Sequence, residues 1–93
     1  MSYEIRWRAS AERDLLALPG EVRARIMVRV EALAENPSPP ASTALKGTLA
    51  GLRRVRVGDY RIAYLVDDAE NIVGIVAIGH RSRFYEDLER NAT

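Results

Sequence analysis

The chain contains no cysteine and a single histidine, His80. Without cysteine it can form no disulfide, and it has no thiolate nucleophile and no zinc–thiolate site. One histidine cannot build a His-rich metal centre, so we expect neither a metal nor any other cofactor. Catalysis by a metal ion or a thiolate is therefore not expected of this sequence.

Long hydrophobic runs are also missing. No segment approaches the roughly 20 apolar residues that a membrane span needs. The first residues, 1–6, have neither the apolar core nor the cleavage site of a signal peptide. We therefore expect a cytoplasmic protein with no membrane partner, in which residues 1–93 form a single domain around one core.

The net charge of +1 conceals an uneven distribution of charge along the chain. Residues 46–64 carry five basic residues and one carboxylate, whereas residues 67–70 are acidic. A basic patch on a nearly neutral domain favours a specific anionic partner over general adhesion to polyanions.

The first half of the chain predicts a strand followed by two helices. Residues 3–8 alternate between apolar and charged side chains, as a half-buried strand does. Apolar residues then recur at helical spacing between Ser10 and Leu18 and again over residues 21–35. Because only Pro19-Gly20 separates these two segments, we expect an antiparallel helical hairpin.

The second half predicts three strands joined by hairpins and a short last helix. The strands cover about 52–57, 60–66 and 72–78, with turns at Gly58-Asp59 and over residues 67–71. The last helix runs from about Ser82 to Arg90. We therefore expect an α+β, two-layer fold, in which an antiparallel sheet of four strands, the N-terminal one included, packs on the helical hairpin.

Arginines gather on one predicted face of this sheet. If Val55 and Val57 point towards the helices, then Arg54, Arg56 and Arg61 emerge on the opposite face. Arg81 follows the last strand closely enough to join them. Several guanidinium groups on one surface suit phosphate binding, which indicates nucleic acid, although single arginines on exposed strands are common surface residues.

Tyr85 and His80 are the candidates for proton transfer near this surface. Tyr85 lies four residues after Arg81, near the start of the last helix, so it can return to the arginine face and serve as a general base. A buried or stacking tyrosine is the alternative. His80 can exchange a proton near neutral pH, but strict alternation places it on the face opposite Arg81, which favours a structural role.

At these residues the chain resembles the RelE/ParE superfamily of toxins from toxin–antitoxin pairs, and within it the RelE branch. The resemblance covers nearly the whole chain, and its central motif is specific. The matching segments are Leu45-Lys46-Gly47, residues 52–64, Gly79-His80-Arg81 with Tyr85 after it, and, in the helical half, residues 11–15 and Leu18-Pro19.

The resemblance implies a metal-independent endoribonuclease that cuts mRNA in the A site of the 70S ribosome. The 2′-OH of a nucleotide would attack its own 3′ phosphodiester and leave a 2′,3′-cyclic phosphate and a 5′-OH. The resemblance also implies a cognate antitoxin that inhibits the toxin and forms a hetero-oligomer with it.

Residue roles follow from the same resemblance. Arg61, Arg81 and Tyr85 would be catalytic, the two arginines by binding the scissile phosphate. The further residues that would contact RNA or its phosphates are Lys46, Arg53, Arg54, Arg56, His80 and Arg83. Well-known relatives have lysines where this chain has Arg54 and Arg56. Because arginine does not lose its proton, these two would stabilise charge only, and proton transfer would rest on Tyr85, with His80 or water.

Two other functions remain open at this point. A ParE-like protein would inhibit DNA gyrase by binding it, without nuclease chemistry, but such chains generally lack the Arg81 and Tyr85 ending. A decayed module would only bind RNA or its antitoxin.

Overall fold

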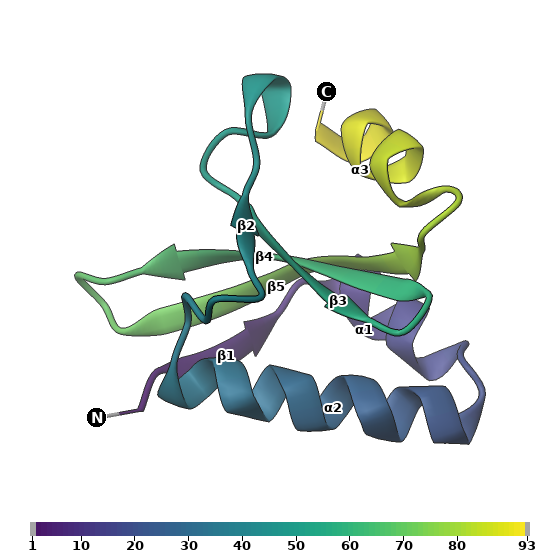
Figure 1. Ribbon diagram of the computed structural model, residues 1–93, viewed down its shortest axis with the longest axis horizontal. Helices are drawn as coiled ribbons and strands as arrows, with labels where there is room; N and C mark the ends of the chain where they lie inside the picture. The colour runs from purple at the N-terminus through teal and green to yellow at the C-terminus, as the bar shows by residue number, and fades with distance from the viewer. Residues whose placement is uncertain (1, 93) are drawn as a thin grey trace.

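The computed structural model describes residues 2–92, except for the side chains of residues 87 and 90–92. Its centre is an open sheet of five strands in which the first strand, β1, is parallel to its neighbour and the remaining pairs are antiparallel (Figure 1). In spatial order the strands are β1 (Glu4–Trp7), β5 (Ile72–His80), β4 (Tyr60–Asp67), β3 (Arg53–Val57) and β2 (Thr43–Ala44).

Helices cover both faces of the sheet to different extents. The helices α1 (Ala9–Leu16) and α2 (Gly20–Glu35) form a hairpin along one face, whereas α3 (Phe84–Ala92) lies on the other side of the strands (Figure 1). A short 3-10 helix, η1 (Gly47–Leu49), follows β2 and contacts α3. None of the helices within residues 2–92 is long and apolar enough to cross a membrane.

The main core lies between the helical hairpin and the sheet. Ile26, Val30 and Leu33 recur at helical spacing on α2 and are almost completely buried. They belong to one cluster with alternate residues of the central strands, including Ile62 and Tyr64 of β4. The buried Tyr64 hydroxyl donates a hydrogen bond of 2.7 Å to the carbonyl of Pro37, which satisfies its polar group and fixes the chain after α2.

A second, smaller core holds α3 against the opposite face. Phe84 and Leu88 are buried in a cluster with Ala63 of β4 and Leu49 of η1. Gly79 of β5 lies directly beneath, since a Cβ there would be 3.5–3.6 Å from Phe84. Small residues on the sheet therefore allow the start of α3, which carries Tyr85, to pack closely on this face.

The α+β architecture, the helical hairpin and the three hairpin-linked strands agree with the expectation from the sequence. The sheet, however, is mixed and not antiparallel, because β1 pairs in parallel with β5 from Glu4↔Ile72 to Trp7↔Ile75. The alternation in residues 3–8 shows which side is buried but carries no information on the partner strand. The helices α1 and α2 carry the chain from β1 to β2 at the other edge of the sheet, and three successive antiparallel pairings then bring β5 back beside β1 in the parallel direction.

The structure also has five strands where four were predicted. The additional strand, β2, consists of Thr43 and Ala44, which pair with Arg54 and Arg53. A strand of two residues is too short to show an alternation of apolar and polar side chains. Helix ends differ as well: α1 begins at Ala9, and α3 begins at Phe84 and not at Ser82, whose hydroxyl lies 3.0 Å from His80 Nδ1.

Two residues on opposite faces of β4 test where the stabilising core lies. Ile62 is 0% exposed beneath the helical hairpin, whereas Leu65 is 40% exposed. We expect Ile62→Ala to lower the free energy of unfolding by about 3 kcal/mol, because it leaves a cavity in a packed core. The matched change Leu65→Ala should cost less than about 1 kcal/mol. Urea unfolding of both variants measures the difference, and equal losses would contradict the assignment of the main core to the helical side.

Candidate functional site

The β3–β4 hairpin places a set of arginines on the face that α3 partly covers. Arg54 pairs with Ala63 across the two strands, and Arg56 pairs with Arg61. Val55, Val57 and Ile62 belong to the core under the helical hairpin, so the alternating arginines point the other way. The register thus directs Arg54, Arg56 and Arg61 away from the core, as predicted, although the Arg56 side chain turns to Gly58 at the end of the hairpin and lines a hollow with α2.

Tyr85 reaches this face from α3 and joins Arg54. The Arg54 Nη1 donates a hydrogen bond to the Tyr85 hydroxyl, and the guanidinium carbon lies 5.9 Å from the centre of the ring. The ring is half-buried and contacts Phe84 edge-to-face, with the centroids 5.1 Å apart. Arg54 Nη2 lies 3.5 Å from Thr43 Oγ1 of β2. Two of the predicted site residues, 31 positions apart in the chain, are thus in direct contact.

Arg61 has a buried donor group without a hydrogen-bond partner among the described residues. Its side chain is half-buried between Arg56 on β3 and Gly79 on β5, which has no side chain to contribute. Its Nη1 is buried and has no hydrogen-bond partner among the residues that the structure describes. A buried N–H without an acceptor costs about 1–3 kcal/mol, so this guanidinium is suited to receive an anion. Phosphate and carboxylate oxygens are the acceptors that a guanidinium group binds in bidentate geometry.

The side chains of Arg53 and Arg56 bind residues other than Tyr85. Arg56 is exposed, and its Nε donates to the Gly58 carbonyl at 2.9 Å, which holds the side chain at the hairpin turn. Arg53 faces away from Arg54 on the strand and donates to Ser42 Oγ at 2.7 Å and 3.2 Å. Lys46 is exposed at the start of η1.

Arg81 and Arg83 lie beyond the end of β5. The Arg81 backbone N–H donates to the Asp59 carbonyl at 2.7 Å, and its Nε lies 3.9 Å from Asp59 Oδ1. Both side chains of this pair are more than half exposed, so the interaction is weak. Arg81 is therefore attached to the turn of the β3–β4 hairpin, at the end of the arginine face. Arg83 is exposed, and its backbone N–H donates a hydrogen bond to the backbone carbonyl of His80.

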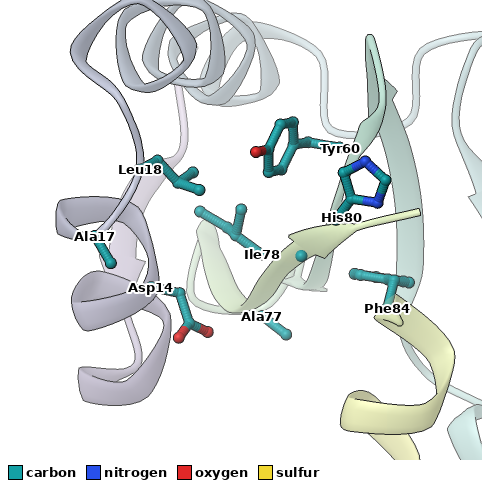
Figure 2. Close-up of a pocket in the computed structure, with 9 residues that line it drawn as sticks. Asp14, Ala17, Leu18, Tyr60, Ala77, Ile78, His80 and Phe84 are labelled. Carbon is teal, nitrogen blue, oxygen red and sulfur yellow. The ribbon is translucent and has the colours of Figure 1, made fainter. Parts of the chain in front are cut away.

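His80 lies on the side of the sheet that α1 covers, together with Ile78, as alternation along β5 predicts. Its ring contacts Tyr60 edge-to-face, with centroids 5.5 Å apart, and its Nδ1 accepts a hydrogen bond from the Ser82 backbone N–H. Figure 2 shows the pocket around it, with Asp14 of α1 and Leu18, which follows that helix, on one side. The pocket has a volume of about 340 Å³. None of the contacts of His80 in the described part of the chain joins it to Arg54 or Tyr85.

Two contact residues of the site could not be identified from the sequence. Thr43 approaches Arg54 only because β2 adds to the edge of β3, and Phe84 positions Tyr85 through the second core. A two-residue strand and a lone aromatic give no periodic signal. Within the described residues, no cluster of three or more His, Cys, Asp and Glu side chains is arranged to hold a metal ion.

Comparison with known proteins places the chain in a family. Residues 5–85 match the family model described as the ParE toxin of a type II toxin–antitoxin system, parDE. The chain is similar to Toxin RelE of Mycobacterium tuberculosis, with 35% identity over 83 residues that cover 89% of this chain and 86% of the relative. It is also similar to Toxin RelG of the same organism, with 31% identity over 85 residues, covering 91% and 98%.

Solved structures lead to the same group. The toxin–antitoxin complex RelBE2 from Mycobacterium tuberculosis matches with a TM-score of 0.80 and 31% identity, covering 88% of this chain and 94% of the other. The archaeal RelE–RelB complex from Pyrococcus horikoshii matches with a TM-score of 0.77 and 27% identity, covering 89% and 99%. The family match, the relatives and the fold together show that this chain belongs to the RelE/ParE superfamily, as a RelE-like toxin of a type II toxin–antitoxin system.

Proposed function

We propose that this toxin is a ribosome-dependent endoribonuclease that cleaves mRNA in the ribosomal A site, without a metal ion. The observation that carries the proposal is the half-buried Arg61, whose Nη1 lacks a hydrogen-bond partner among the described residues, on the face where Arg54 contacts Tyr85. A phosphodiester supplies the anionic oxygens that these guanidinium groups bind, and the phenol supplies a hydroxyl next to them.

The proposed reaction is an internal transesterification of RNA. The 2′-oxygen of one nucleotide forms a bond to the adjacent phosphorus, and the bond from phosphorus to the 5′-oxygen of the next nucleotide breaks. The proton of the 2′-OH goes to a base, and the leaving 5′-oxygen gains a proton. The products are a 2′,3′-cyclic phosphate and a 5′-OH, so atoms and charge balance without any further reactant.

Each residue of the site has a role in this reaction. Arg61 and Arg81 bind the scissile phosphate, and Arg54 stabilises the additional negative charge of the transition state by about 2–4 kcal/mol where it makes contact. Arginine cannot act as a base, because its guanidinium keeps its proton in proteins. Proton transfer therefore rests on Tyr85, whose oxygen Arg54 holds at the arginine face.

The remaining basic residues are proposed to contact the RNA. Lys46, Arg83 and Arg56 are exposed around the site, and Arg53 lies at the edge of β3. We also propose an RNA contact for His80, as the resemblance implies. Its ring is directed towards Tyr60 and the α1 side of the sheet.

A cognate antitoxin is the proposed inhibitory partner. The RelBE2 and Pyrococcus horikoshii structures are complexes of a toxin with its antitoxin, which supports a hetero-oligomer for this chain as well. Arg54, Arg56 and Arg61 form a basic face, so we propose that an acidic or amphipathic segment of the antitoxin covers it. We place this pair in the cytoplasm, where ribosomes and mRNA are present.

The experiment that tests the function is cleavage of a defined mRNA by the purified toxin, with and without programmed ribosomes. We expect cuts only on the ribosome, with cyclic phosphate at the 3′ ends of the products. Cleavage that depends on a Mg²⁺ ion bound to the toxin would contradict the proposed reaction. Products with 3′-OH ends would contradict it as well.

A second candidate is a ParE-like inhibitor of DNA gyrase, which the description of the matching family favours. The two functions differ in their dependence on the end of the chain. If the protein binds gyrase, growth arrest survives replacement of Arg81 and Tyr85, and gyrase supercoiling stops at toxin concentrations at which ribosomal mRNA stays intact. A nuclease loses its toxicity with the same replacements.

Tyr85→Phe tests proton transfer while it keeps the ring packing. We expect the rate of mRNA cleavage on the ribosome to fall about 100-fold or more, because the hydroxyl is lost and the contact with Phe84 is retained. Tyr3→Phe is the matched control, since Tyr3 donates to Asp68 on the opposite end of the molecule and should keep full activity. Single-turnover cleavage measures both, and an active Tyr85→Phe variant would remove Tyr85 from the chemistry.

Arg61→Gln tests the phosphate site. We expect a loss of about 100-fold or more in cleavage rate, because the half-buried guanidinium is the group best placed to hold the phosphate in the transition state. Arg13→Gln removes the same charge from an exposed position on α1 and serves as the control. If both variants lose activity equally, net charge and not the geometry of Arg61 determines the rate.

A further inference from the structure

A second group of arginines lies around a separate hollow between α2 and the β3–β4 hairpin. The hollow has a volume of about 400 Å³. Its charged lining residues are Arg25 and Arg29 of α2 and Arg56 of β3, and its apolar lining residues include Val28, Ala32 and Val57. Arg25 and Arg29 are one helical turn apart, so they face the same side of α2. No carboxylate lines this hollow among the residues that the structure describes.

The hairpin turn brings two of these cations together. Gly58 has a φ of +60°, and a Cβ added there would lie 2.9 Å from Arg25 Nη2. Only glycine therefore allows the Arg25 guanidinium to lie against the turn in this backbone conformation. Arg56 donates from its Nε to the carbonyl of the same Gly58 at 2.9 Å. The guanidinium groups of Arg25 and Arg56 thus both lie beside Gly58, although they come from two different layers of the fold.

Among the described residues, the lining of the hollow offers these cations no carboxylate. The ion pairs of Arg6 with Glu4 and of Arg81 with Asp59 do not involve this hollow. Like charges one turn apart on a helix destabilise it by a few tenths of a kcal/mol. A fold that gathers unpaired guanidinium groups around a hollow gains stability when an anion enters it.

We propose that Arg25, Arg29 and Arg56 form a second anion-binding site, which takes a backbone phosphate of RNA next to the one at Arg61. The proposal rests on the proposed function in that it takes the bound polymer to be RNA. Arg54 and Arg56 are two residues apart on β3, so their Cα atoms are separated by about 7 Å along the strand. A single RNA strand bound at Arg54 and Arg61 therefore reaches Arg56, and its phosphates supply the negative charge that the three guanidinium groups around the hollow lack.

The test measures the binding of a short, fully 2′-O-methylated single-stranded RNA by fluorescence anisotropy at several salt concentrations. Such RNA cannot be cleaved, so binding is separated from chemistry. The test variant is Arg25→Gln/Arg29→Gln, and the control is Arg8→Gln/Arg13→Gln, which removes two exposed charges elsewhere. Coinciding thermal unfolding curves show that both variants are folded.

We expect the test variant to bind about tenfold or more weakly at 0.1 M salt and to reduce the slope of log K against log[salt] by about 0.7, the value for the loss of one phosphate contact on a single strand. Arg25→Lys/Arg29→Lys should keep the slope while losing part of the affinity, because lysine keeps the charge but not the bidentate geometry. The control variant should change neither quantity appreciably.

Three results would overturn the proposal. The slope of the test variant stays at the wild-type value; the control lowers the slope as much as the test variant does; or a polyglutamate peptide displaces the RNA from the wild type, but not from the test variant, at equal charge concentration. The last result would assign the hollow to an acidic protein segment. Failure of the proposed function gives a different result. In that case the wild type does not cleave mRNA on the ribosome, while its RNA binding still depends on Arg25 and Arg29.

Discussion

The register of the β3–β4 hairpin is the constraint on which the rest of the site depends. Arg56 is opposite Arg61 and Arg54 is opposite Ala63, while Ile62 and its neighbours face the helical hairpin. A shift of one residue would turn the arginines into the core and the apolar side chains to the surface, so burial fixes the register strongly. The stability of the main core therefore also fixes the position of the cations.

The start of α3 completes this face. Phe84 and Leu88 bury against Ala63, and the absence of a side chain at Gly79 lets Phe84 approach β5. As a consequence Tyr85 lies beside Arg54, which comes from a strand 31 residues earlier. The second core is smaller than the main one, and its buried residues are Leu49, Ala63, Phe84 and Leu88.

Much of the fold follows from the sequence because the signals are periodic. The alternation in residues 52–66 predicts both strands and the face of each arginine, and the spacing of Ile26, Val30 and Leu33 predicts the buried side of α2. Periodicity does not specify partners, which is why the parallel pairing of β1 with β5 and the two-residue strand β2 were not predicted.

The site was predictable to a lesser degree. The strand pattern places Arg54, Arg56 and Arg61 on one face, but the contact of Tyr85 with Arg54 depends on how α3 docks. The attachment of Arg56 to Gly58, and of Arg81 to Asp59, depends on side-chain rotamers near a turn. The second arginine group required the packing of α2 against the hairpin, since Arg25 and Arg56 are far apart in the sequence.

The central claim is that Arg61 and its neighbours hold the scissile phosphate. The most direct measurement is a structure of this toxin on a programmed ribosome, with an mRNA whose A-site nucleotides carry 2′-O-methyl groups. The account predicts a phosphate oxygen within hydrogen-bonding distance of Arg61 Nη1 and the blocked 2′-oxygen close to the Tyr85 hydroxyl. An mRNA backbone that passes over another face, with Arg61 Nη1 still buried away from it, would contradict the account.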